Sequence, residues 1–138
     1  MAVKRQQTGM RGVFLVAAEL TARGVIASPT SRSAFGADLL VTDQDCLRAF
    51  SVQVKTNARH SNFWLLNKHS KRLKSSNHIY VFVNLSVAGQ PTEYYVVPSK
   101  IVAQRMCIER RRDSTWYSFD LSHAVKYRNK WNVFGARR

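Results

Sequence analysis

Three side chains with metal-binding or phosphate-binding chemistry lie in two short apolar runs near the middle of the chain. Asp38 lies in the first run, residues 36–41, and Gln53 and Lys55 end the second, residues 50–55. Both runs are rich in residues that favour strands, and a polar segment with two aspartates separates them. This pattern predicts a β-hairpin that carries all three side chains.

The alternation of side chains along a strand decides which of these groups can meet. Gln53 and Lys55 are two residues apart and share one face, while Val52 and Val54 point into the packing on the other. If the strands pair about the centre of the turn, Asp38 lies opposite or nearly opposite Gln53. A carboxylate, an amide oxygen and an ammonium then gather on one surface, as metal-dependent cleavage of a phosphodiester requires.

The charge of the chain favours a polyanionic partner. The 138 residues include 22 Lys and Arg but only 8 Asp and Glu, which gives a net charge of +14. Nucleic acid is the first expected partner of such a field and an anionic membrane the second. A basic protein without chemistry of its own, such as a ribosome-associated one, has the same composition, so the charge alone does not separate these alternatives.

Several other classes lack their signals in the sequence. Cys46 and Cys107 are too few and too far apart for a metal cluster or a disulfide framework, so both are expected to be reduced thiols. The four histidines show no zinc-ligand spacing, and no nucleophile elbow, phosphate-binding loop or dinucleotide fingerprint occurs. No apolar run approaches the roughly 20 residues of a membrane span, and no signal peptide is visible, so we expect a cytoplasmic protein.

The order of elements predicts one domain of the α/β or α+β class, with a mixed central sheet flanked by helices. We expect residues 1–8 to be a flexible basic leader and residues 9–138 to be the domain. The chain is long enough to bury a core without staples. The predicted elements are helices at 9–23, 67–76, 98–106 and from Ser122; strands at 25–27, 36–41, 50–55, 79–85, 93–97 and 116–119; and a charged loop at 108–114.

On these residues the chain resembles the PD-(D/E)xK nuclease superfamily, and in layout its small, Holliday-junction-resolvase-like members. The resemblance rests on the first helix with Glu19, on Gly36-Ala37-Asp38-Leu39-Leu40-Val41 and on Val52-Gln53-Val54-Lys55. It spans roughly residues 9–100. It implies a restriction-endonuclease-like core of one helix, a mixed four-stranded sheet and a second helix, with the site at one edge of the sheet.

The resemblance also implies metal-dependent hydrolysis of DNA with Mg²⁺ or Mn²⁺. Asp38 would be the principal ligand, with the Gln53 amide oxygen and the Val54 backbone carbonyl beside it. Lys55 would hold the attacking water and stabilise charge on the phosphate. Glu19 could complete the metal shell. The family's second acidic position is Gln53 here, so the site has one negative charge fewer and should hold magnesium less tightly.

A basic segment after Trp64 is the expected site of contact with the phosphate backbone of DNA. Its cations are Lys68, Lys71, Arg72 and Lys74, and Arg32 in the loop before Asp38 is a further candidate. The same residues would equally form a solvated charged face. Because one site attacks one strand, a homodimer is expected, with exposed aromatic residues such as Trp116 at its interface.

Two alternatives to the nuclease remain open at this point. The first is a nucleic-acid-binding module on the same scaffold, in which Gln53 has made catalysis weak or absent. The second is a toxin-like, phage or mobile-element protein whose basic surface binds an acidic inhibitor or partner. For Asp38, the plainer alternative is a residue that accepts backbone hydrogen bonds beside a turn. For Gln53 and Lys55, it is the polar face of a half-exposed strand.

Overall fold

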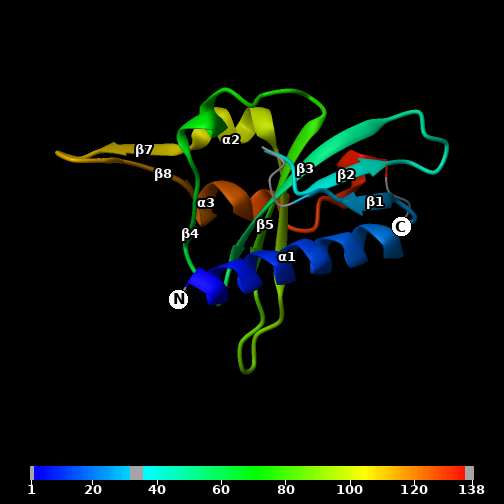
Figure 1. Cartoon of the computed structure of the whole chain (residues 1–138), viewed down its shortest axis with the longest axis horizontal. Helices are drawn as coiled ribbons and strands as arrows, with labels where there is room; N and C mark the ends of the chain where they lie inside the picture. Colours follow the sequence, from blue (N-terminus) through cyan, green and yellow to red (C-terminus); the bar gives the residue numbers. More distant parts are fainter. Residues whose placement is uncertain (1, 32–35, 136–138) are drawn as a thin grey trace.

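A mixed five-stranded sheet forms the centre of the protein. The computed structural model describes residues 2–31 and 36–135. The strand order is β1-β2-β3-β5-β6, and only the β3–β5 pair is parallel (Figure 1). The predicted α/β class with a mixed central sheet is confirmed, although the sheet has five strands rather than four. The strands are β1 Ile26–Pro29, β2 Leu39–Thr42, β3 Ala49–Asn57, β5 His78–Asn84 and β6 Glu93–Pro98.

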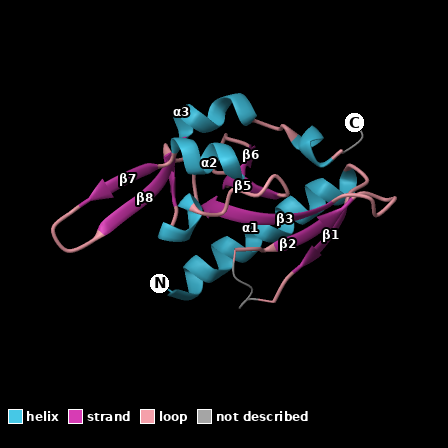
Figure 2. Ribbon diagram, turned by 90° about the horizontal axis from the view of Figure 1, so that it is seen from above, coloured by secondary structure: helices cyan, strands magenta, loops and turns pink. Residues whose placement is uncertain are grey.

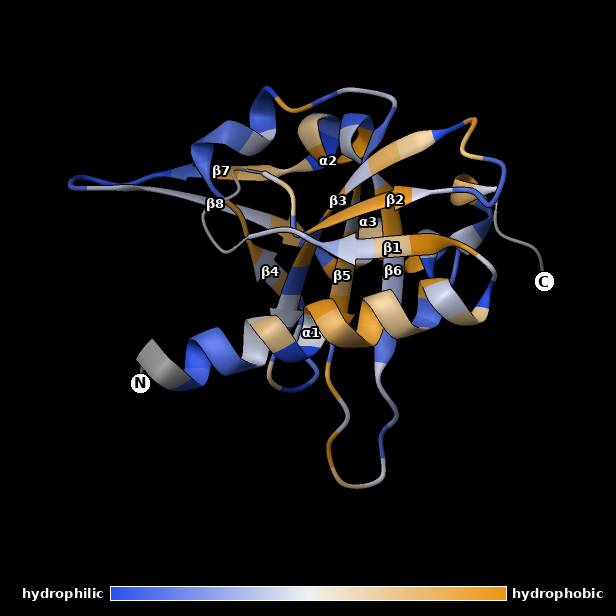
Figure 3. Cartoon of the chain, turned by 45° about the vertical axis from the view of Figure 1, so that its right-hand side comes forward, coloured by the Kyte–Doolittle hydropathy of each residue, from blue (hydrophilic) through white to orange (hydrophobic). Residues whose placement is uncertain are grey.

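The middle of this sheet is apolar on both faces. All seven residues of β5 are buried, as predicted for a central strand, because it lies between β3 and β6 and is covered from both sides. In Figure 3 the hydrophobic residues gather on the central strands and on the part of α1 that crosses them. The sheet therefore separates two hydrophobic clusters, one on each face.

Different elements cover the two faces. The long helix α1 (Ala2–Ala22) lies on one face and buries Val13, Val16 and Leu20 there. Helices α2 (Ser99–Arg105) and α3 (Leu121–Ala124) and a second sheet contribute to the cluster on the other face (Figure 2). This second sheet has the order β4-β8-β7, and its strands are β4 Phe63–Leu65, β7 Cys107–Arg110 and β8 Thr115–Asp120.

Two buried aromatic residues fasten the second sheet to the first. Phe119 of β8 stacks on Phe82 of β5 with ring centres 4.9 Å apart. Trp64 of β4 is buried, and its indole Nε1 donates to the Val83 carbonyl of β5 at 3.0 Å. Its ring packs against Phe82 and Tyr95, with ring centres 5.1 and 5.5 Å away. Beyond these anchors, the β7–β8 hairpin projects away from the body of the molecule (Figure 1).

Helix α1 begins earlier than the sequence pattern indicates. It starts at Ala2 rather than Gly9, so residues 2–8, which we expected to be a leader, belong to its first turns. No acidic residue stands in the first turn to mark the start of the helix. The apolar periodicity begins only where the helix reaches the sheet, so it could not mark the earlier turns.

Three other segments differ from expectation for physical reasons. The predicted helix at 67–76 is only a 3-10 turn, η1 (Lys68–Lys71), although Asn67 does cap it by accepting from the His69 N–H at 2.9 Å. Its many cations provide no apolar stripe that could hold a longer helix. The expected charged loop at 108–114 instead contains β7 and the turn of the β7–β8 hairpin. The final helix is capped by Asp120 rather than Ser122.

The end of the described chain is also more ordered than its polar composition indicates. Two 3-10 turns, η2 (Val125–Tyr127) and η3 (Trp131–Phe134), follow α3. Trp131 and Phe134 are buried in the cluster under α1, and the Phe134 ring meets Phe50 edge-on at 5.3 Å. Within the described residues, no helix is long and apolar enough to cross a membrane.

Candidate active site

The pairing of β2 with β3 places Asp38 opposite Gln53. Leu39 pairs with Val52, so the next pair along the antiparallel ladder is Asp38 with Gln53. The ladder continues to that point, because the Asp38 N–H donates to the Val52 carbonyl at 2.7 Å. On the other side, the Thr30 N–H donates to the Asp38 carbonyl at 3.0 Å. Asp38 is thus held by backbone hydrogen bonds from both neighbouring chain segments.

The side chain of Asp38 also points toward β3. Its Oδ2 accepts a hydrogen bond from the Val54 N–H at 2.8 Å. This contact orients the carboxylate and leaves Oδ1 as the oxygen that can face a cation. The N–H and C=O of a strand residue point toward the same neighbouring strand, so the Val54 carbonyl lies on this side of β3 as well.

The two faces of β3 separate as the alternation predicts. Val52 and Val54 are buried in the cluster beneath α1, while Gln53 and Lys55 are only half-buried on the opposite face. The parallel register places Gln53 beside Tyr80 of β5 and Lys55 beside Phe82. The side chains of Asp38, Gln53 and Lys55 therefore share the face of the sheet that α1 does not cover.

Lys55 is close enough to Asp38 for their charges to interact. Burial lowers the pKa of the Lys55 ammonium, and the negative charge of Asp38 opposes this shift. The two side chains form no direct ion pair within 4.0 Å. A lysine in this position is close to the carboxylate without being neutralised by contact with it, so the ammonium stays available to an anionic ligand.

A histidine that the sequence analysis passed over belongs to the same cluster. His78 opens β5 beside Ser51 of β3, and its Nδ1 lies 2.7 Å from the Ser51 Oγ. Burial lowers the pKa of His78, and Asp38 opposes that shift too. Its Nε2 is buried without a hydrogen-bond partner. His78 follows Ser51 by 27 residues in the sequence, so only knowledge of the β3–β5 pairing could have placed the two side by side.

Glu19 is not part of this cluster. It lies on α1, which covers the opposite face of the sheet, and its carboxylate forms an ion pair with Arg23 at 2.6 Å. Its charge acts on Tyr94 of β6, two strands away from β3, where burial is the largest cause of a raised pKa. The structure therefore does not bring Glu19 together with Asp38.

The basic segment reaches the border of the site. Gly36 has a left-handed φ of 72°, and a Cβ there would lie 3.3 Å from the Leu73 side chain, so the chain after η1 touches the loop that leads into Asp38. Its cations Lys68, Lys71, Arg72 and Lys74 are exposed. Lys71 Nζ donates to the Ala103 carbonyl at 3.0 Å, and the Arg72 Nη2 lies 3.0 Å from the His69 Nδ1. Arg32 lies outside the described residues.

The cluster offers oxygen donors to a hard cation, although only one of them is a carboxylate. Within residues 2–31 and 36–135, no group of three His, Cys, Asp or Glu side chains could hold a metal ion. The set on this face is one carboxylate, one amide and one backbone carbonyl, all of them oxygen donors. Magnesium is commonly bound by one or two carboxylates together with waters and substrate phosphates, and this set fits that pattern.

Comparison with known proteins identifies the fold. No protein-family model matches the chain, and no curated protein matches its sequence. Among solved structures it is similar to Hjc, a Holliday junction resolvase of the archaeal hyperthermophile Archaeoglobus fulgidus. The TM-score is 0.62 at 13% identity, over 94% of this chain and 98% of that one. D212, a nuclease from a fusselovirus, matches with a TM-score of 0.53 at 9% identity, over 97% and 92% of the two chains.

Proposed function

We propose that this chain, which has the fold of these nucleases, is a metal-dependent DNA endonuclease. The observation that carries the proposal is the position of Asp38, held against the Val54 N–H and directly opposite Gln53 on the face that also presents Lys55. A carboxylate, an amide and an ammonium gathered on one face of a nuclease fold support hydrolysis of a phosphodiester. The net charge of +14 supports DNA as the partner.

In this proposal Mg²⁺ or Mn²⁺ binds at the Asp38 carboxylate, the Gln53 amide oxygen and the Val54 carbonyl. The bound cation would shield the phosphate charge and acidify a water molecule. Lys55 would orient that water and stabilise the negative charge that develops on the phosphate oxygens. His78 would fix the position of Ser51, which lies two residues before Gln53 on β3, through their contact at 2.7 Å.

The basic residues around η1 would position the DNA without reading its sequence. All four cations of this segment, Lys68, Lys71, Arg72 and Lys74, are exposed, and Lys71 also links η1 to α2. We include a homodimer in the proposal, because each site attacks one strand and paired cuts need two sites. The molar mass of the purified protein, measured by light scattering, tests this assembly.

The test is cleavage of supercoiled plasmid and of a four-way DNA junction with Mg²⁺ and with Mn²⁺. We expect nicking that stops on chelation of the metal and falls at least about 100-fold in Lys55→Ala. The matched control is Lys126→Ala, which removes one exposed charge from η2 outside the cluster. Equal cleavage by the wild type and Lys55→Ala would contradict the proposed role of Lys55.

Gln53 favours a second candidate function, a DNA-binding module without catalysis. The described part of the site has a single carboxylate, and a neutral amide attracts a divalent cation less than a second carboxylate does. Such a module would bind DNA with a steep dependence on salt and release no product with either metal. The same cleavage assay therefore separates the two functions.

A further inference from the structure

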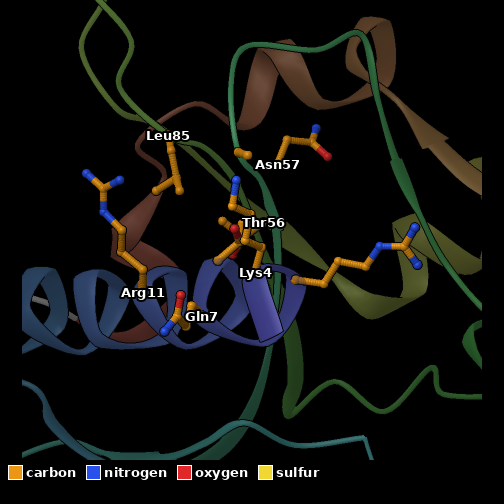
Figure 4. A pocket seen from close by; sticks show the side chains of 9 residues that line it. Lys4, Gln7, Arg11, Thr56, Asn57 and Leu85 are labelled. Atoms are coloured by element: carbon orange, nitrogen blue, oxygen red, sulfur yellow. The ribbon is translucent and has the colours of Figure 1, made fainter. Parts of the chain in front are cut away.

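A basic pocket lies on the α1 side of the sheet, away from Asp38. Its volume is about 650 Å³, and it opens between the first turns of α1, the end of β3 and the residue that follows β5 (Figure 4). Its lining is cationic or polar apart from Ala58 and Leu85. The lining residues are Lys4, Arg5, Gln7, Thr8, Arg11, Thr56, Asn57, Ala58 and Leu85.

No carboxylate among the described residues is paired with the cations of this pocket. Three of its lining residues, Lys4, Arg5 and Arg11, are cations and none is acidic. The nearest acidic residue along α1 is Glu19, which is paired with Arg23. A concave surface with three unpaired cations and several neutral hydrogen-bonding groups is complementary to a phosphate.

The positive end of α1 repels the two cations nearest to it, which destabilises the protein when no anion is bound. The N-terminal end of a helix carries a partial positive charge, so Lys4 and Arg5 stand at the end that repels them. The buried apolar anchors of α1, Val13, Val16 and Leu20, all lie in its second half. The first turns therefore contribute charge rather than core packing, and a bound anion would relieve both the side-chain and the helix-end repulsion.

One end of the pocket is fixed by a close contact between α1 and β3. A Cβ on Gly12 would lie 1.8 Å from the Thr56 Oγ1, so only glycine allows this approach of the helix to the strand. The Thr56 Oγ1 is buried and has no hydrogen-bond partner. Thr56 follows Lys55 directly, and the alternation of the strand sends the two side chains to opposite faces. The pocket and the candidate active site thus share one end of β3.

We propose that this pocket binds a backbone phosphate of nucleic acid, as a second contact point separate from the cleavage site. Lys4, Arg5 and Arg11 supply the charge, and the side-chain amide of Gln7 supplies a neutral hydrogen bond. The Asn57 amide only shapes the pocket, because its Nδ2 already donates to the Phe63 carbonyl and to the Asn84 Oδ1. The phosphate of a free nucleotide has the same chemistry, so the test includes both ligands. The proposal concerns binding alone and does not depend on catalysis.

The test is the binding of a fluorescent duplex of about 20 base pairs without divalent metal, measured by anisotropy at several salt concentrations. The variant is Lys4→Gln/Arg5→Gln/Arg11→Gln. The control is Lys100→Gln/Lys126→Gln/Lys130→Gln, which removes the same charge from exposed positions elsewhere. We expect the pocket variant to bind the duplex at least about tenfold more weakly. The plot of log K against log salt should also become less steep, by about 0.9 for each phosphate that the variant no longer neutralises. The control should change affinity less than about threefold.

Thermal unfolding of both variants shows whether α1 remains folded, and Arg11→Lys, which keeps the charge, should retain binding. Equal losses of affinity in the pocket variant and the control would overturn the proposal. A pocket that binds deoxyadenosine monophosphate as tightly as the duplex would overturn it too, in favour of a nucleotide site. Binding that depends on the pocket in a protein that never cleaves DNA would contradict the proposed nuclease alone.

Discussion

The two faces of β3 are built from alternate residues of one strand, yet they differ in almost every physical property. Val52 and Val54 face α1 and are buried among apolar side chains. Gln53 and Lys55 face the other way and are half-buried, and Asp38 lies on the same face. One face of the strand therefore holds the fold together, while the other is free to carry chemistry.

The largest effect on stability should come from the apolar face. Val52 is fully buried, so Val52→Ala should lower the free energy of unfolding by about 2–3 kcal/mol, because apolar burial is reduced and a cavity remains. Its neighbour Gln53 points to the other face, and Gln53→Ala should cost less than about 1 kcal/mol. Urea unfolding measures both. Similar destabilisation of the two variants would break the contrast between the faces.

The contact of α1 with β3 should be next in size. Gly12→Ala places a methyl group against Thr56 and should destabilise the protein by about 2 kcal/mol. Gly9→Ala is the matched control on the same helix, because nothing lies within 4 Å of its Cβ position. There the alanine should stabilise the helix by up to about 1 kcal/mol.

A double variant sharpens this prediction. Thr56→Ala removes the hydroxyl and methyl groups that the new Cβ would meet, so Gly12→Ala/Thr56→Ala should lose less stability than the sum of the single variants. If the stability losses of the two single variants simply add up in thermal or urea unfolding, the contact with Thr56 is not the reason that residue 12 must be glycine.

A smaller effect is expected from restoring charge at the polar face. Gln53→Glu adds a second carboxylate opposite Asp38, and we expect it to bind Mn²⁺ about tenfold more tightly, which is about 1.4 kcal/mol. Isothermal titration calorimetry measures this affinity directly. Unchanged affinity would mean that the Gln53 side chain does not face the bound ion.

The sequence was sufficient for the parts of the site that lie close together along the chain. Strand alternation and a short turn fix the positions of Asp38, Gln53 and Lys55, and the structure brings these three together as predicted. His78 joins them through a parallel pairing with a strand far along the chain, and no local pattern carries that information.

The same distinction explains the other differences. The central strand β5 was visible as a continuous apolar run, whereas the first turns of α1 have no apolar periodicity to reveal them. Glu19 stands at a helical position whose relation to Asp38 depends on which face of the sheet α1 covers, and the sequence contains no signal for that choice. Strand β7 and the turn after it have few apolar residues and were predicted as a charged loop, whereas β8 lies over the strand predicted at 116–119.

The most direct test of the central claim is Asp38→Asn, measured for both DNA cleavage and stability in one preparation. Asparagine keeps the oxygen that accepts from the Val54 N–H, so the fold should be retained within about 1 kcal/mol by urea unfolding. The loss of the charge should lower the single-turnover cleavage rate with Mn²⁺ at least about 100-fold. Wild-type cleavage by a folded Asp38→Asn protein would contradict the account.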